Sequence, residues 1–239
     1  MPKTNSRILR LIVSVSFIFF SLLGSIHFWC FNESFYKSEH DKLILYGKHI
    51  SEYIGISDED LQKLTHFTLA YLNDPKATLD IQMEVKGKTR EIFTDDEKAH
   101  MVDVQKLNLT ANYLLIGSGV VFAISMILYI VKKYSFSELF LSYKRVLLYV
   151  LVFVGCIGMW ILIDFDSFWT FFHHVFFSQN DLWLLDLRKD VLIMIVPPEF
   201  FFHLVTAILL TFIGILLAYN IALYVIDRIV RENDKRRVI

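Results

Sequence analysis

The sequence predicts an α-helical integral membrane protein with four transmembrane helices. A small α+β extracytoplasmic domain is expected between helices 1 and 2, and an interfacial or re-entrant aromatic segment between helices 3 and 4. Of the 239 residues, 55% are hydrophobic and 21% are charged, a balance too apolar for a soluble protein. The apolar residues concentrate in four long runs without charge, and the basic residues gather between alternate runs.

The four uncharged runs are 22, 25, 18 and 27 residues long and cover residues 11–32, 107–131, 146–163 and 200–226. A bilayer core of ~30 Å needs about 20 apolar residues in helical form, so each run predicts a membrane span. The first run follows Lys3, Arg7 and Arg10, as a signal peptide would. Its apolar part exceeds the usual length of about 7–15 residues, and no small-residue cleavage site follows, so we predict a retained helix. Trp29 would anchor this helix at the interface.

Charge predicts the orientation of these helices. Residues 1–10, 132–145 and 227–239 together hold 12 Lys and Arg against 4 acids, and the rest of the chain holds 12 against 21. Because short basic segments stay in the cytoplasm, both termini are predicted there, with 33–106 and 164–199 outside. Nothing in this pattern indicates nucleic-acid binding, and the basic tail is suited to contact with anionic membrane lipids.

The predicted outer domain, 33–106, reads as helix, helix, hairpin, helix. Ser57 begins a helix over 57–72, with Asp60 three residues later as in a capping box. The alternating LDIQMEV predicts a half-buried strand, KGK a turn and TREIF the returning strand. TDDE, with Thr94 as cap and Glu97 at the third helical position, then begins a helix that can continue into the second membrane span.

The second outer segment, 164–199, contains SFWTFFHHVFF at 167–177. This stretch is too short to span a bilayer, and backbone at membrane depth must satisfy its own hydrogen bonds, so an interfacial or re-entrant helix is expected. Acids and a tryptophan follow, and a Pro pair at 197–198 breaks the chain before the fourth span. Because that segment lies against the bilayer, its acids need partners, and Arg188 and Lys189 are available to Asp186 and Asp190.

Two histidines are the candidate catalytic residues. His100 has Asp103 three residues on, and a carboxylate in that position can orient an imidazole, although such pairs are also common on solvated helices. His173 lies in the aromatic stretch, where a titratable group is costly unless it has a partner or a task. Its neighbour His174 points about 100° away on a helix, so at most one of them can face a pocket shared with His100. The alternative is that both face lipid headgroups.

The other histidines are expected to have ordinary roles. His27 and His203 would extend towards the interface, and His40, His49 and His66 would lie on the surface. Cys30 and Cys156 form no CxxC pair, and the chain contains no HExxH, GxSxG or phosphate-binding loop. We therefore predict no metal and no cofactor.

Several motifs together resemble the bacterial integral membrane family of lipoprotein intramolecular transacylases. They are EKAHMVDVQ at 97–105, FHHVFF at 172–177, NDLW…D…D at 180–190 and PPEFFF at 197–202. The order of four helices with two outer insertions is also similar, so the resemblance covers the whole chain. Leu187 departs from it, since the family often has Pro after this Asp.

The resemblance implies an acyltransferase that moves the sn-2 acyl chain of a diacylglyceryl-Cys lipoprotein to the α-amine of the same Cys. The family's two catalytic histidines correspond to His100 and His173. We expect His100 to act as base and His173 as donor to the oxyanion, with the reverse assignment open. No acyl-enzyme is then needed. Support or orientation is expected from Asp103, Glu97, Trp183, Asp186, Asp190 and Glu199.

The expected partners are the diacylglyceryl-modified N-terminus of a lipoprotein and membrane lipids, with a monomer favoured. The expected location is the bacterial plasma membrane, with the active site at its extracytoplasmic face. Two other functions compete with this hypothesis: a non-catalytic membrane sensor or accessory protein, and a metal-dependent membrane hydrolase.

Overall fold

The computed structural model describes residues 3–237, with side chains described for 6–233, so the extreme ends of the predicted basic tails lie outside the described residues. The chain forms two compact units. The bundle unit comprises Met1–His27, Asn112–Trp160 and Thr206–Ile239, and the mixed unit comprises Phe28–Ala111 and Ile161–Val205.

The four predicted membrane helices are confirmed. They are α1 (Lys3–Cys30), α5 (Asp95–Val131), α6 (Phe136–Ile163) and α9 (Pro198–Arg237), each long and apolar enough to cross a bilayer. The helix that begins at the TDDE sequence does continue without a break through the second apolar run. Pro198 occupies the first position of α9, where the missing N–H of proline costs no helical hydrogen bond.

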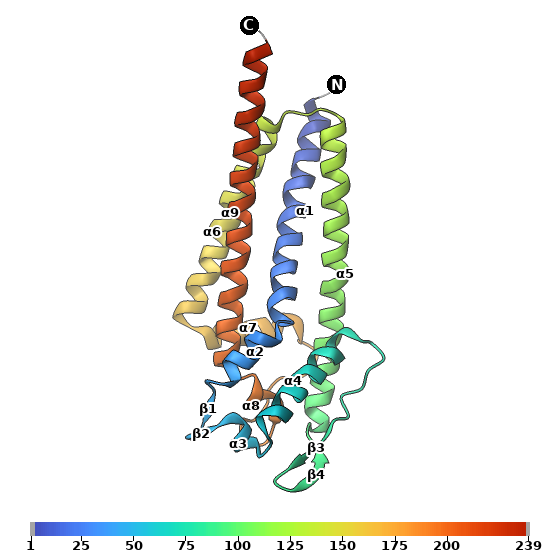
Figure 1. The fold of residues 1–239 in the computed structure, drawn as a ribbon, viewed down its shortest axis with the longest axis vertical. Helices are drawn as coiled ribbons and strands as arrows, with labels where there is room; N and C mark the ends of the chain where they lie inside the picture. The colour runs from blue at the N-terminus through green and yellow to red at the C-terminus, as the bar shows by residue number, and fades with distance from the viewer. Residues whose placement is uncertain (1–2, 238–239) are drawn as a thin grey trace. The chain divides into compact units, whose positions relative to one another are not determined.

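In the bundle unit, α1 lies beside the other three long helices (Figure 1). The ring of Phe17 on α1 has its centroid 5.1 Å from Phe122 on α5, 6.2 Å from Tyr143 on α6 and 3.9 Å from Tyr219 on α9. The Tyr143 hydroxyl donates to the carbonyl of Leu216 at 2.9 Å, which ties α6 to α9. Aromatic packing and a satisfied buried hydroxyl therefore hold this part of the bundle together.

The mixed unit contains α2 (Glu33–His40), β1 (Ile44–Leu45), β2 (Lys48–His49), α3 (Ile50–Ile54), α4 (Asp58–Asn73), β3 (Gln82–Val85), β4 (Lys88–Glu91), α7 (Phe165–Phe176) and α8 (Val191–Ile195). Ser57 caps α4 as predicted, its hydroxyl accepting from the Asp60 N–H at 3.0 Å. The predicted hairpin is also present: β3 and β4 pair antiparallel, and Val85 lies opposite Lys88. Lys86 and Gly87 both have positive φ, 53° and 78°, as a two-residue type I′ turn requires.

The predicted order of elements in this region was incomplete. A second hairpin, β1–β2, and the short helix α3 lie between α2 and α4. Each strand of this hairpin has only two residues, too few for an alternating pattern to be recognised. Its turn again uses two residues of positive φ, Tyr46 and Gly47, but a Tyr at the first of these positions is a weak turn signal.

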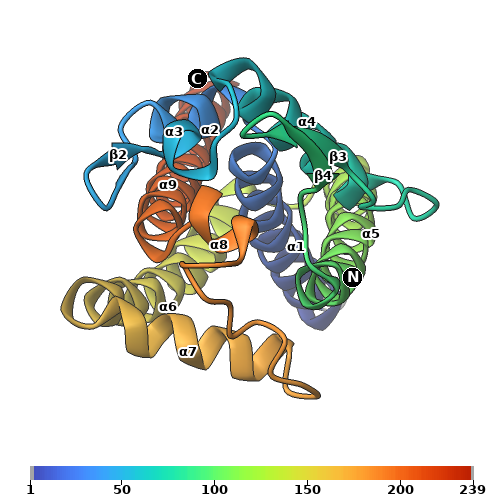
Figure 2. The ribbon, with the colours of Figure 1, turned by 90° about the horizontal axis from the view of Figure 1, so that it is seen from below.

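The core of the mixed unit joins segments that are far apart in the sequence. Leu61 and Leu64 of α4 pack in one buried cluster with Val191, Leu192 and Ile195 of α8. Figure 2 shows the chain leaving the end of α7 and turning back to α8, which lies against α3. The second outer segment is thus packed into the first, which brings the two predicted site histidines into a single unit.

Candidate active site

The first turns of α5 present one side of the site. Thr94 and Glu97 form the predicted capping box: the Thr94 N–H and hydroxyl donate to Glu97 Oε2 at 2.6 and 2.9 Å. Glu97 is fully buried, and its other oxygen, Oε1, accepts from the Leu192 N–H at 2.6 Å. Leu192 is in the first turn of α8, so one carboxylate caps two helices. Burial raises the pKa of Glu97, an effect that the hydrogen bonds from Leu192 and Thr94 oppose.

The two predicted catalytic histidines lie close together. His100 on α5 is 7% exposed and His173 on α7 is 6% exposed, and their ring centroids are 6.3 Å apart. Phe177 contacts both imidazoles, with its ring centroid 5.2 Å from His100 and 5.6 Å from His173. His174 is exposed and turned away from this pair, as the helical geometry predicted.

The two imidazoles have different hydrogen bonds. His173 Nδ1 lies 2.8 Å from the carbonyl oxygen of Trp169. A carbonyl only accepts, so His173 carries its proton on Nδ1, and Nε2 of the neutral ring has a free lone pair. By contrast, His100 Nδ1 is buried without a hydrogen-bond partner among the described residues.

Burial keeps both rings in their neutral form near neutral pH. His100 lies outside the uncharged stretch 107–131, in the charged first turns of α5. Burial, with the nearby His173 imidazole, lowers the pKa of His100 to about 4, against a smaller opposing effect of Asp103. Burial also lowers the pKa of His173, while the hydrogen bond to Trp169 opposes this. A neutral imidazole is the form that can accept a proton.

The Asp103 carboxylate has other hydrogen-bond partners than the His100 imidazole that it was expected to orient. Its carboxylate accepts from Asn180 Nδ2 at 3.1 Å and from Lys106 Nζ at 3.2 Å, and within residues 6–233 it makes no hydrogen bond to His100. Residues three apart lie only about 60° apart around a helix, so the two side chains share a face, but the half-exposed Asp103 carboxylate is engaged by Asn180 and Lys106. The hydrogen bond to Asn180 holds the second outer segment against α5 and keeps the pKa of Asp103 below its usual range.

The remaining predicted support residues divide into two groups. Trp183 belongs to the site: its ring stacks on His173 with centroids 4.7 Å apart and an interplanar angle of 26°. Asp190 is buried and accepts from the Asp186 N–H at 2.7 Å. Asp186 pairs with Arg188, as the sequence suggested, and Glu199 is exposed in the first turn of α9, so neither reaches the imidazoles.

Sequence reasoning missed two contributors, Phe177 and Asn180. Asn180 directly precedes the acid and tryptophan of the NDLW motif, and its role depends on a partner 77 residues earlier in the chain. No local pattern could reveal that partner. Phe177 was one of many aromatic residues in its segment, and only the fold distinguishes it from the others.

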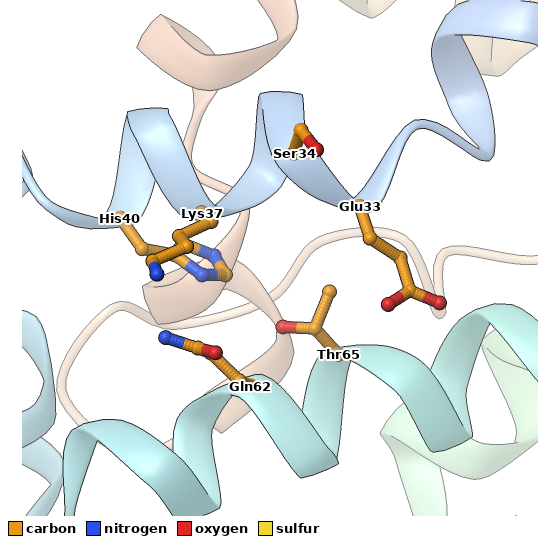
Figure 3. A pocket seen from close by; sticks show the side chains of 6 residues that line it. All are labelled: Glu33, Ser34, Lys37, His40, Gln62 and Thr65. Carbon is orange, nitrogen blue, oxygen red and sulfur yellow. The ribbon is translucent and has the colours of Figure 1, made fainter.

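His40 was expected on the surface, and the structure corrects this. Its side chain is buried, and its Nε2 donates to the carbonyl of Ile195 at 2.9 Å. It lines a pocket of about 200 Å³ between α2 and α4, where Lys37 and His40 face Gln62 and Thr65 (Figure 3). This pocket contains neither His100 nor His173, so it is separate from the imidazole pair.

The fold and the site together define a multi-pass membrane protein with a pair of buried histidines that hold no charge at neutral pH. The profile of one family, described as lipoprotein intramolecular transacylase Lit, matches residues 11–201. The chain therefore belongs to the lipoprotein intramolecular transacylase family, whose members are acyltransferases of the membrane.

Solved structures support the same fold. The structure of the membrane integral lipoprotein intramolecular transacylase Lit from Bacillus cereus matches with a TM-score of 0.76 at 22% identity, covering 98% of this chain and 100% of that one. Two variants of the same protein, in which a histidine is replaced by arginine or by alanine, match with TM-scores of 0.71 and 0.70. A search of curated protein sequences gives no match.

Proposed function

We propose that this protein moves the sn-2 acyl chain of an N-terminal diacylglyceryl-Cys to the α-amine of the same Cys, giving a lyso-form lipoprotein. One observation carries the proposal. Two buried, neutral imidazoles from α5 and α7 lie 6.3 Å apart, and one of them has a free ring nitrogen. Such a pair can accept a proton from an amine and donate a hydrogen bond to an ester at the same time.

His173 is the better candidate for the base, which reverses the expected assignment. Its Nδ1–H is engaged with the Trp169 carbonyl, so its Nε2 can accept but not donate. The substrate's α-amine has an ordinary pKa near 8, so the pH sets the fraction of substrate that reaches the site with a neutral amine. His100 then serves as a hydrogen-bond donor to the ester through its N–H. Asp103 acts indirectly, by holding Asn180 and its segment in place.

The reaction needs no acyl-enzyme. The amine nitrogen attacks the ester carbonyl carbon, and an N–C bond forms while the carbonyl π electrons move to oxygen. The tetrahedral intermediate collapses with cleavage of the C–O bond to the glyceryl group. His173 takes one proton from the nitrogen and passes it to the departing glyceryl oxygen. Because amine and ester belong to one molecule, the substrate itself supplies their proximity.

The aromatic rings around His173 suit the acyl chain. Trp169 stacks on Phe172 with centroids 5.5 Å apart and lies 4.2 Å from Phe201. We propose that these rings contact the acyl chain and that the site opens at the extracytoplasmic face of the bacterial plasma membrane. The partners are then a diacylglyceryl-modified lipoprotein N-terminus and the surrounding lipids, and the protein acts as a monomer.

The proposal is tested with the purified protein and a synthetic diacylglyceryl-Cys lipopeptide. The product is an isomer of the substrate, so fragment-ion mass spectrometry must locate the acyl chain on nitrogen. Two lipopeptides, one heavy in the peptide and one heavy in the acyl chains, are mixed in equal amounts. Intramolecular transfer gives no product that is heavy in both parts or in neither, whereas an intermolecular transferase scrambles the label.

Substitutions test the histidine pair in the same assay. His100→Ala and His173→Ala should each lower the rate by about 10²–10⁴, the usual contribution of such groups. His174→Ala is the matched control, since this exposed neighbour should be replaceable with little loss. A normal rate in either variant of the pair would contradict the mechanism. Loss of activity with a chelator would instead support a metal-dependent enzyme, and an inactive wild-type protein would support a sensor.

A further inference from the structure

Three buried side-chain polar atoms in the described part of the mixed unit have no hydrogen-bond partner. They are His100 Nδ1, Trp183 Nε1 and Asp190 Oδ1. Buried polar groups are nearly always paired, so an unpaired one marks a place where a partner is missing. One belongs to His100 of the imidazole pair and one to Trp183, which stacks on His173, and this makes the substrate the natural partner of both.

The nitrogen of Trp183 is the more informative of these two. An indole N–H can only donate, so what it lacks is an acceptor. The ring stacks on His173 at 4.7 Å and meets His174 edge-on at 5.5 Å. The stacked arrangement puts the indole beside the imidazole that would take the proton from the attacking amine.

The oxyanion of the reaction needs such a donor. His173 cannot provide one, because its only proton in the neutral form is held by the Trp169 carbonyl. A donor that is already in place and shielded from water stabilises developing charge more than a solvated one does. The indole N–H meets both conditions, since its nitrogen is buried and carries no competing hydrogen bond.

We propose that Trp183 is a catalytic residue whose Nε1–H donates to the carbonyl oxygen of the sn-2 ester and to the oxyanion formed from it. The inference rests on the proposed acyl transfer. His100 is then left to donate to the glyceryl oxygen, which accepts the proton that His173 carries. The N–C bond forms and the C–O bond breaks as before, and no further reactant enters.

The segment around Trp183 is held in a way that suits this task. Asn180 Oδ1 accepts from the Leu182 N–H at 3.1 Å, and Asn180 Nδ2 donates to Asp103 on α5. The Trp183 carbonyl accepts from the Leu185 N–H at 3.0 Å. The tryptophan therefore sits in a closed turn attached to the helix that carries His100.

The test replaces the N–H while keeping the ring. In one variant Trp183 is exchanged for β-(3-benzothienyl)alanine, in which sulfur takes the place of N–H, and Trp183→Phe is a second variant that keeps an aromatic ring. Both should lower kcat on the lipopeptide by about 10²–10³, the cost of losing one oxyanion donor, with KM changed less than about threefold. The pH profile should keep its shape, since the proton acceptor is unaltered.

Other outcomes are equally clear. A benzothienyl variant within about twofold of the wild-type kcat would overturn the inference, even if Trp183→Phe were slow through loss of stacking. If the wild-type protein forms no N-acyl product, the proposed function itself fails. If His100→Ala and His173→Ala are inactive while both Trp183 variants keep the wild-type kcat, only the role of the indole fails.

Discussion

A single backbone carbonyl determines the state of His173. The oxygen of Trp169, one helical turn earlier, can only accept, so it fixes the proton of the neutral ring on Nδ1. His100 has no equivalent partner on Nδ1 and is held by packing against Phe177. Two histidines of similar burial therefore differ in what they can offer, and neither sequence context reveals the difference.

The burial of His100 also predicts how stability depends on pH. Its pKa is about 4 in the folded protein and near 6.5 in an unfolded chain, so the unfolded state binds the proton more readily. The free energy of unfolding is highest above about pH 6.5, where His100 is neutral in both states. It falls by up to about 3 kcal/mol as the pH falls from there towards 4, because the unfolded chain is protonated first. Melting temperatures of the detergent-solubilised protein should therefore fall over this range.

The control for this prediction is His100→Asn, which removes the titrating group. Its melting temperature should fall less between pH 6.5 and 4 than that of the wild-type protein. The substitution Asp103→Asn tests the smaller opposing effect, since Asp103 favours the protonated imidazole. If the melting temperatures of His100→Asn and wild type fell equally between pH 6.5 and 4, His100 would not titrate in this range.

At the scale of elements, the double cap by Glu97 links helices that the chain separates widely. At the start of α5 one carboxylate oxygen accepts from the Thr94 N–H, and the other accepts from the Leu192 N–H of α8. Asp190, the residue before α8, makes no side-chain cap there. α8 in turn packs in the core of the mixed unit. The buried Glu97 side chain thus adds to the core packing of α8 and to the Asp103–Asn180 hydrogen bond in holding the second outer segment.

Glu97→Ala should therefore be strongly destabilising. It leaves the buried N–H of Leu192 and the partly buried N–H of Thr94 without their acceptor, and hydrogen bonds to a charged group contribute about 1.5–3 kcal/mol each. The melting temperature should fall by several degrees, and the rate should fall with it as α8 loosens. Asp96→Ala is the matched control: Asp96 is exposed in the same turn, and its loss should cost a few tenths of a kcal/mol. Equal stability of the two variants would disprove the double cap.

What could be predicted from the sequence at this scale follows from the range of the interactions involved. The membrane helices, the Ser57 and Thr94 caps and the β3–β4 hairpin depend on neighbours within a few residues, so their patterns are visible in the sequence. The contacts of Glu97 with Leu192, of Asp103 with Asn180 and of His40 with Ile195 join residues 77 to 155 positions apart. No periodicity encodes such pairs.

The histidine pair could be predicted from the sequence only in part. Each histidine could be singled out from its own surroundings, the capped helix for His100 and the aromatic stretch for His173. Their proximity could be expected only from the family resemblance. The tautomer of His173, the unpaired indole nitrogen of Trp183 and the partner of Asp103 are properties of the folded chain and had no counterpart in the sequence.

At the scale of the whole molecule, charge connects the fold to the membrane. The three segments predicted to be cytoplasmic hold 12 Lys and Arg against 4 acids. Some of these charges also tie the bundle together, because Arg10 of α1 pairs with Glu138 of α6, and Arg231 of α9 donates to the Ser137 hydroxyl of α6 at 3.2 Å. Residues that are predicted to set the orientation thus also link helices of the bundle.

The orientation predicts which residues a membrane-impermeant maleimide can reach in protoplasts. In a background with Cys30→Ser and Cys156→Ser, Lys76→Cys and Asp181→Cys should be labelled, because these exposed positions lie in the segments predicted to be outside. Arg228→Cys, which is equally exposed, should be labelled only after the membrane is permeabilised. The reverse pattern would place the imidazole pair on the cytoplasmic side. The enzyme would then have no access to lipoprotein N-termini displayed on the outer surface, and the acyl transfer proposed for His100 and His173 would need a different substrate.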